Sequence, residues 1–236
     1  MPKLSFVIPC YNKQSYISEC LNSLIKQTLK DIEIIVVDDC STDNSLDVVK
    51  WLAKKDKRIK IFRLRKNKGR SYARNYGNNK AKSDILCVQD ADDISAENRA
   101  KTIYEYFKKH PEKDIFYSSF YVSDVYGEPI EEIVAIPFNI ENVLKTKVTY
   151  IGHSTMAYRK EPVMDIKYSD GKWSSLGLDD WKLQLDLYKA GYKFGFVRKP
   201  LMIYRQVSNS ISHIRSAVDV YKQKGLYLNE SFVSTH

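Results

Sequence analysis

Glycine and proline are scarce in this sequence, and several protein classes can be excluded from what it lacks. With 9 glycines and 7 prolines in 236 residues, the chain is neither collagen-like nor low in complexity. Its longest apolar stretches are about six residues, whereas a membrane-spanning helix needs roughly 20. No signal-peptide core precedes the first strand-like segment, which predicts a cytoplasmic location. The 4 cysteines show no C-x-x-C spacing, so reduced structural thiols are expected rather than disulfides or a zinc site.

The glycine-rich phosphate loops of two common nucleotide-binding folds are also absent. The loop at residues 9–13 contains no glycine, so it lacks the G-x-G-x-x-G that lets a backbone approach a pyrophosphate closely. No G-x-x-x-x-G-K-[ST] occurs elsewhere in the chain. A nucleotide bound by this protein must therefore be recognised by side chains and by a metal site.

The net charge of +9 is concentrated in one segment. Residues 50–82 contain fourteen Lys or Arg and one acidic residue, so this segment carries +13 and the rest of the chain −4. Lys54, Lys55 and Lys57 fit a solvated helix face, whereas the cations at residues 63–74 extend through a strand end, a loop and a helix. They predict a positive rim for phosphates or for an anionic membrane surface. Nucleic acid is not an expected partner, because no nucleic-acid-binding module accompanies the charge.

Apolar segments alternate with amphipathic ones in the first half of the chain. Strands are expected at residues 4–9, 32–37, 59–64 and 85–88, and helices at 15–26, 45–53, 71–79 and 96–109. Continuous apolar strands that alternate with helices are typical of a mostly parallel sheet covered on both faces. In such α/β folds, ligands bind beyond the carboxyl ends of the strands.

The alternation breaks down after about residue 110, which predicts a mixed α+β second half. Strands are expected at 115–122, 153–158, 193–197 and 201–204, a turn at 124–129, a helix from about 180 to 190, and another at 216–228. We expect one domain over residues 1–236. Its nucleotide-binding half is residues 1–110, its acceptor-binding half residues 111–215, and its C-terminal helix and tail residues 216–236.

Three carboxylates, Asp90, Asp92 and Asp93, directly follow the apolar run at residues 85–88. Carboxylates packed this closely repel one another unless a cation or protons neutralise them. Hard divalent cations prefer such oxygen ligands and leave positions open for phosphate. The alternative is that these residues cap the helix expected from residue 96. A second acidic strand end, at residues 38–39, favours the metal site over capping. With two acidic ends, one can contact the base and ribose of a nucleotide-diphosphate donor while the other holds a metal ion on its diphosphate.

Six motifs carry a resemblance to a known family. They are V-I-P-C-Y-N at residues 7–12, V-D-D-C-S-T-D at 37–43, N-K-G at 67–69, A-R-N at 73–75, D-A-D-D at 90–93 and L-D-D-W at 178–181. Their order and spacing resemble family 2 glycosyltransferases of the GT-A fold, from about residue 3 to residue 212. The resemblance implies an inverting enzyme that uses Mn²⁺ or Mg²⁺ and a nucleotide-diphosphate sugar, which we expect to be UDP-linked. The expected acceptor is a hydroxyl of a glycan or of a lipid-linked molecule, in cell-envelope polysaccharide synthesis.

The same resemblance assigns roles to individual residues. It implies substrate contacts from Pro9, Tyr11, Asn12, Asp39, Asn67, Arg74, Asp90, Ala91, Asp179 and Arg205. Among these, the loop at residues 9–12 and Asp39 would contact the base, Arg74 the diphosphate, and Asp90 the ribose and metal beside Asp92. Asp180 is the candidate general base, although it could instead cap the helix that follows. Val207 stands where the family has a histidine, so His213 is considered as a third metal ligand in its place.

Two other function classes remain open from the sequence. A nucleotidyltransferase of similar fold would normally show a glycine-rich loop after the first strand, and none is present. A noncatalytic nucleotide- or sugar-binding module, or a receiver-like module, would fit the acidic pair at residues 38–39. A receiver domain would leave the second half of the chain unexplained.

Overall fold

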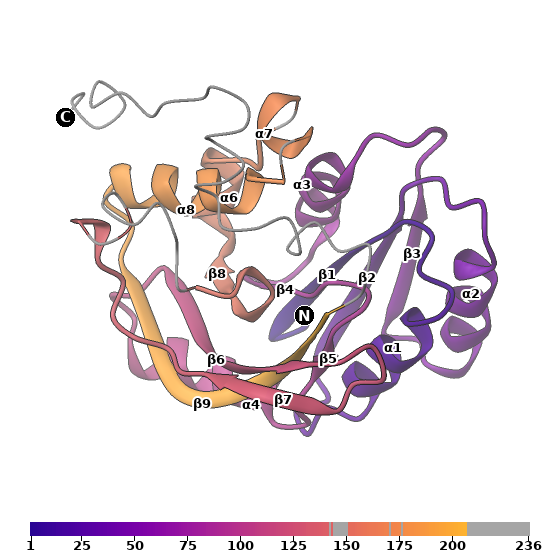
Figure 1. Cartoon of the computed structure of the whole chain (residues 1–236), viewed down its shortest axis with the longest axis horizontal. Helices are drawn as coiled ribbons and strands as arrows, with labels where there is room; N and C mark the ends of the chain where they lie inside the picture. Colours follow the sequence, from indigo (N-terminus) through magenta and orange to yellow (C-terminus); the bar gives the residue numbers. More distant parts are fainter. Residues whose placement is uncertain (142, 144–150, 170, 176, 207–236) are drawn as a thin grey trace.

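A computed structural model describes residues 1–141, 143, 151–169, 171–175 and 177–206 of the chain. They form a nine-stranded sheet with helices on both faces (Figure 1). Within this described part, no helix is long and apolar enough to cross a membrane.

The first half is a parallel α/β unit. It contains, in chain order, β1 (Leu4–Cys10), α1 (Ile17–Ile25), β2 (Ile32–Asp38), α2 (Ser45–Lys55), β3 (Ile59–Arg63), α3 (Arg70–Lys80) and β4 (Ile85–Val88). β1 lies between β2 and β4, and β3 pairs with the outer edge of β2; all three pairings are parallel. Every residue of β2 and β4 is buried, because helices cover both faces. The predicted α/β class is confirmed.

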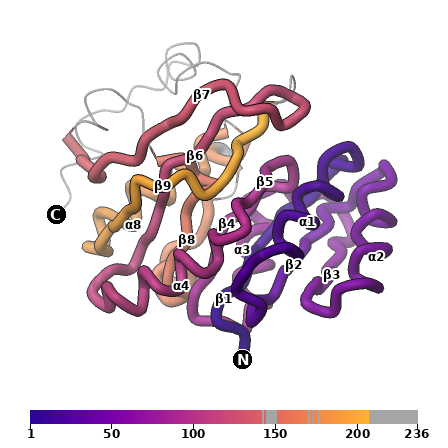
Figure 2. Tube along the Cα trace, turned by 90° about the horizontal axis from the view of Figure 1, so that it is seen from below, coloured from indigo at the N-terminus to yellow at the C-terminus, as the bar shows by residue number. Residues whose placement is uncertain are grey.

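The second half adds antiparallel pairings, so the complete sheet is mixed. Its elements are β5 (Ile94–Ser95), α4 (Arg99–Lys109), β6 (Ile115–Ser123), β7 (Pro129–Ile133), the 3-10 turn η1 (His153–Thr155), β8 (Ala157–Arg159), α6 (Lys160–Asp165), α7 (Lys172–Ser175), α8 (Asp179–Lys189) and β9 (Phe194–Arg205). β8 is antiparallel to both β4 and β6, whereas β9 is parallel to β6 and antiparallel to β5. The strands β6, β7 and β9 lie at one end of the molecule and α2 and β3 at the other (Figure 2).

Several predicted elements differ from the structure. The strand expected at 153–158 is the turn η1 followed by β8, because the Thr155 hydroxyl donates to the Gly152 carbonyl, at 2.7 Å, and favours a turn. The two strands expected at 193–197 and 201–204 are the single strand β9, whose register shift against β6 accommodates Pro200. α4 begins at Arg99 rather than at residue 96. The helix expected at 216–228 lies outside the described residues.

Alternate residues of β2 define the two layers of the core. Ile34 and Val36 pack with side chains of α1, α2 and α4, whereas Ile35 and Val37 pack with side chains of α3, α6 and α8. Successive side chains of a strand point to opposite faces, so α3 and α8 cover the same face of the sheet. The starts of these two helices are neighbours, because Arg70 of α3 donates to Asp179 of α8 at 2.8 Å.

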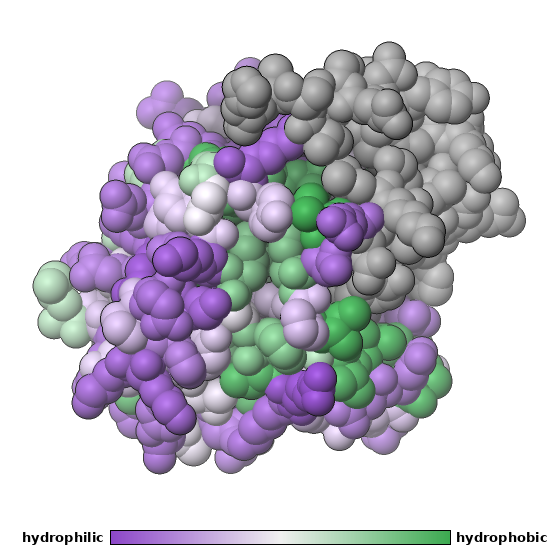
Figure 3. Space-filling model, turned by 90° about the vertical axis from the view of Figure 1, so that its left-hand side faces the viewer, coloured by the Kyte–Doolittle hydropathy of each residue, from purple (hydrophilic) through white to green (hydrophobic). Residues whose placement is uncertain are grey.

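The surface of the second half contains apolar as well as polar side chains (Figure 3). Among the described residues of this half, the exposed large apolar side chains are Val125, Tyr126, Ile130, Val134, Ile136 and Tyr188. Five of these six lie in or beside the β6–β7 hairpin, at residues 125–136.

Candidate active site

The acidic residues lie at the carboxyl ends of neighbouring parallel strands. Asp38 and Asp39 stand at the end of β2, and Asp90 follows β4 after one residue. Because β1 separates these two strands, the loop after β1 lies between the two acidic ends. The crevice beyond such strand ends is where open α/β sheets bind ligands.

Asp39 anchors the loop that leads into α3. Its two carboxylate oxygens accept the backbone N–H groups of Lys68 and Gly69, each at 2.7 Å. Gly69 has φ +85°, a conformation that glycine adopts without steric cost. Burial raises the pKa of Asp39, and the two backbone bonds offset this only in part. The neighbouring Asn67 is exposed, at the rim of the strand ends.

The loop after β1 presents polar and aromatic groups at the same edge. Tyr11 and Asn12 are exposed and Pro9 is half-buried. Asn12 has φ 51°, and its side-chain carbonyl accepts the backbone N–H of Thr42 at 2.9 Å. This bond joins the loops that follow β1 and β2. It therefore stabilises the loop in which Tyr11 is exposed.

Each carboxylate of the cluster at residues 90–93 has a polar partner. Asp90 receives hydrogen bonds from Arg74, at 2.7 Å, and from the Ser154 hydroxyl, at 2.8 Å. Asp92 pairs with the Lys13 ammonium at 2.5 Å, and Asp93 accepts the backbone N–H of Arg205 at 3.0 Å. Burial alone would raise the pKa of Asp90, but the Arg74 guanidinium outweighs it and holds this pKa well below its ordinary value.

These contacts contradict the alternative in which the cluster caps a helix. α4 begins at Arg99, after Asn98, and among the described residues no side chain caps it. The Ser95 hydroxyl donates to the Gln89 side chain at 2.7 Å, away from the helix N–H groups. The carboxylates are instead held by cations and N–H groups of distant segments.

The cluster fits a divalent cation that shares its coordination with a substrate. Among the residues the structure describes, no group of three or more His, Cys, Asp or Glu side chains is arranged to hold a metal ion. Magnesium-type sites commonly use one or two carboxylates, with substrate phosphates and water as the other ligands. Asp92 meets this requirement, because its side chain is partly exposed and its partner is the flexible ammonium of Lys13. His213, the third ligand considered, lies outside the described residues.

The acidic pair at the start of α8 divides into a buried and a partly exposed residue. Asp179 is completely buried, whereas Asp180 is only partly buried. One oxygen of Asp180 accepts the N–H of Trp181 at 2.8 Å, and among the described residues no side chain caps α8. Burial raises the pKa of Asp180, and the charge of Asp179 raises it further. A raised pKa makes Asp180 a better proton acceptor than an ordinary surface carboxylate.

Five residues expected to contact substrate are buried instead. Asp39 is 2% exposed, Arg74 5%, Ala91 2%, Asp179 0% and Arg205 4%. The guanidinium of Arg205 donates to the carbonyl oxygens of Asp92, at 3.0 Å, and Val125, at 2.8 Å, and pairs with Glu19. We interpret these buried residues as framework that shapes the strand ends. This departs from the direct contacts that the motifs implied.

Some residues that organise the site carried no signal in the sequence. Arg99 is fully buried and donates to the carbonyl oxygens of Val88, at 2.8 Å, and Ser154, at 2.6 Å. It also donates to the Gln89 side chain at 2.8 Å, and Gln89 in turn donates to the carbonyl of Asp93 at 3.0 Å. An arginine in an amphipathic helix is normally expected at the surface. Lys13 could have been noticed, because it directly follows the motif at residues 7–12.

A family model described as "Glycosyl transferase family 2" matches residues 5–167. The chain belongs to this family. The glycosyltransferase GlyG of Streptococcus pneumoniae serotype 4 is 28% identical over 247 residues, which covers 94% of this chain and 79% of that protein. TuaG of Bacillus subtilis, a putative teichuronic acid biosynthesis glycosyltransferase, is 28% identical over 211 residues and is covered to 82%. This family 2 glycosyltransferase spans a smaller share of other relatives, such as 32% of the length of GlyA of S. pneumoniae.

Solved structures confirm the GT-A fold of this family 2 glycosyltransferase. S. aureus TarS 1-349 in complex with UDP has a TM-score of 0.70 and 24% identity, and the match covers 86% of this chain and 60% of that one. The mannosyltransferase PcManGT from Pyrobaculum calidifontis, in complex with GDP-Man and Mn²⁺, has a TM-score of 0.70 and 15% identity, with 97% and 65% covered. At these identities the likeness concerns the fold. Family membership makes the protein an enzyme and disfavours the receiver-like and noncatalytic alternatives.

Proposed function

We propose that this glycosyltransferase transfers a sugar, with inversion, from a UDP-linked donor to a hydroxyl of a glycan or lipid-linked acceptor. The observation that carries the proposal is that Arg74 bonds both Asp90, at one of two acidic strand ends, and Asp179, which directly precedes the partly exposed Asp180. Relatives add support, since TarS has been solved with UDP-GlcNAc and TuaG is described as a putative teichuronic acid biosynthesis glycosyltransferase. Cell-envelope polysaccharide is therefore the proposed product class.

The chain's own residues account for the steps of such a transfer. The exposed loop with Tyr11 and Asn12 holds the nucleoside, beside the loop that Asp39 anchors. Asp180 accepts the proton of the acceptor hydroxyl as its oxygen attacks the anomeric carbon, and the bond from that carbon to the diphosphate oxygen breaks. A divalent cation held by Asp92 and the donor phosphates would stabilise the charge of the departing diphosphate.

The proposal predicts selective binding of uridine nucleotides. In titration calorimetry with Mn²⁺, UDP should bind at least about tenfold more tightly than GDP, a difference of about 1.4 kcal/mol. The donor can then be identified by measuring hydrolysis across a panel of UDP-linked and GDP-linked sugars. Tighter binding of GDP, together with hydrolysis of a GDP-linked sugar, would replace UDP as the proposed carrier.

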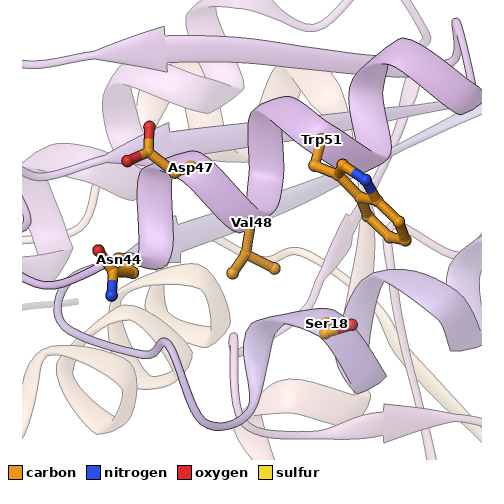
Figure 4. Close-up of a pocket in the computed structure, with 5 residues that line it drawn as sticks. All are labelled: Ser18, Asn44, Asp47, Val48 and Trp51. Atoms are coloured by element: carbon orange, nitrogen blue, oxygen red, sulfur yellow. The ribbon is translucent and has the colours of Figure 1, made fainter.

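A second part of the proposal is peripheral contact with an anionic membrane on the cytoplasmic side, through α2. Trp51 is 54% exposed, and the Lys55 ammonium lies 3.2 Å from the centre of its ring. A groove lined by Ser18, Asn44, Asp47, Val48 and Trp51 runs beside it, between α1 and α2 (Figure 4). An exposed tryptophan next to lysines suits the interfacial region of an anionic bilayer. A lipid-linked acceptor would be met at such a surface.

Neutralising Lys54, Lys55 and Lys57 with glutamine should weaken binding to vesicles of phosphatidylglycerol and phosphatidylcholine. Each lysine near an anionic surface contributes about 1 kcal/mol, so the triple variant should lose roughly 100-fold in partition coefficient at low salt. Vesicle cosedimentation measures this, and UDP affinity should not change. The matched control neutralises three exposed lysines of α4, Lys101, Lys108 and Lys109. Equal losses in both triple variants, or no binding by the wild type, would contradict a membrane contact through α2.

A further inference from the structure

The start of α3 and the loop before it donate hydrogen bonds to carboxylates from three separate parts of the chain. Asp39, after β2, accepts the backbone N–H groups of residues 68 and 69. Asp90, after β4, accepts one terminal nitrogen of Arg74 at 2.7 Å. Asp179, at the start of α8, accepts the other terminal nitrogen of Arg74 at 3.0 Å. One guanidinium therefore joins the donor-binding strand ends to the helix that carries Asp180.

Asp179 is saturated by side chains of α3. One of its oxygens accepts the Nε of Arg70, at 2.8 Å, and also pairs with a terminal nitrogen of the same guanidinium. The other oxygen accepts the Ser71 hydroxyl and the Arg74 guanidinium, each at 3.0 Å. Because Asp179 is completely buried, it has no surface to offer to a substrate. Burial raises the pKa of Asp179, but Arg74 and Arg70 outweigh it and keep the carboxyl ionised.

Much of the other packing of α8 is apolar and does not specify its position along the helix axis as sharply. Leu183 and Leu187 pack in the core beneath α3, and Trp181 and Leu185 pack with a smaller cluster. Apolar packing is non-directional, whereas charge-assisted hydrogen bonds between guanidinium and carboxylate groups impose a distance and an orientation. The ion pairs of Asp179 thus provide a directional link between the start of α8 and α3.

We propose that Asp179 is a positioning residue, whose ion pairs with Arg70 and Arg74 hold the adjacent Asp180 at the correct distance from the donor-binding ends of β2 and β4. The inference rests on the proposed function, in which Asp180 is the base. It gives the two acids of the pair different roles, one buried and structural and one partly exposed and catalytic. Arg74 serves both halves of the site because its two terminal nitrogens bind Asp90 and Asp179.

The test compares Asp179→Asn, Arg70→Met and the double variant, using hydrolysis of the nucleotide sugar identified above and titration with UDP. Displacement of a catalytic group by about 1 Å can cost roughly 10²-fold, so each single variant should lose about 10–100-fold in kcat. UDP affinity should stay within about threefold of the wild type, because the donor ligands are untouched. The double variant should fall no further than the worse single variant, since both remove the same contact.

The pH dependence of kcat separates a positioning role from a loss of stability, because a loss of stability alone would not shift the pH at which kcat falls. The charged groups that act on Asp180 are Asp179, Arg70 and Arg74. Asp179→Asn removes a negative neighbour and leaves both arginines less neutralised, and both changes lower the pKa of Asp180. The acid limb of kcat should therefore move to lower pH in Asp179→Asn. The matched control is Asp186→Asn, which breaks the Lys182–Asp186 pair within α8 and should leave the profile unchanged.

Hydrogen exchange supplies a measurement that does not depend on turnover. The amides of residues 180–182 should exchange faster in Asp179→Asn and in Arg70→Met than in the wild type or Asp186→Asn. Unchanged exchange, or additive losses of kcat in the double variant, would overturn the positioning role. If Asp180→Asn is inactive while Asp179→Asn matches the wild type, only this inference fails. If Asp180→Asn keeps wild-type turnover, the assignment of Asp180 as the general base in the proposed function is wrong.

Discussion

Replacing Asp180 with asparagine is expected to lower the rate of sugar transfer by about 10²–10⁴-fold, the usual contribution of a general base. Asparagine has nearly the same size and can still accept the N–H of Trp181, the bond seen in the structure. It cannot accept a proton from an acceptor hydroxyl. Burial and the charge of Asp179 raise the pKa of Asp180. As the pH is lowered, wild-type activity should therefore begin to fall at a pH above the ordinary pKa of an aspartate.

Steady-state kinetics with a true acceptor measure this effect, and calorimetry with UDP checks that donor binding is retained. A UDP affinity within about threefold of the wild type would place the loss in the chemical step. Asp186→Asn, at a partly buried position of the same helix that pairs with Lys182, serves as the control for removal of a carboxylate from α8. Near-normal transfer by Asp180→Asn would assign the base to another group.

Removing divalent cations should weaken UDP binding by roughly tenfold or more, equivalent to at least about 1.4 kcal/mol. The reason is electrostatic, because a diphosphate near Asp90 and Asp92 is repelled unless a cation lies between them. Calorimetry in Mn²⁺, in Mg²⁺ and in EDTA gives the comparison. Asp92→Asn should bind UDP with similar affinity in Mn²⁺ and in EDTA, since it lacks the proposed metal ligand.

The Lys13 ammonium lies 2.5 Å from Asp92. It could therefore supply the positive charge at this site in place of a metal ion. If equal affinity in Mn²⁺ and EDTA were found for the wild type, lysine would supply the positive charge and the metal role would be removed. Asp47→Asn is the matched control, because Asp47 is an exposed carboxylate of α2 that pairs with Lys50. Its metal response should equal that of the wild type.

The sequence was sufficient to predict the first half of the fold. Its strands are apolar throughout and its helices have one apolar face, and these local periodicities determine secondary structure wherever burial drives it. The same pattern predicted that the acidic residues after β2 and β4 lie at one edge of the sheet, because the carboxyl ends of parallel strands meet there. Six short motifs in register also identified the family, which the match over residues 5–167 confirms.

The sequence was less informative where hydrogen bonds rather than burial decide the structure. The turn at His153–Thr155 was expected to be a strand, because its composition does not reveal the bond from Thr155 to Gly152. The interruption at Pro200 was interpreted as a strand end, although a register shift against β6 keeps β9 continuous. The first error came from a local side-chain hydrogen bond, and the second from a strand pairing that overrides the local effect of proline.

Only the tertiary structure decided which charges neutralise which. Asp92 pairs with Lys13, 79 residues away in sequence, and Asp179 with Arg70, 109 residues away. A motif shows that carboxylates are present, but their exposure and partners depend on how strand ends and helix starts converge. By itself, therefore, the sequence determined the α/β class, the family and the acidic strand ends, because these depend on local pattern. The separation of Asp179 from Asp180 into a buried and a partly exposed role depends on long-range ion pairs, which no spacing along the chain specifies.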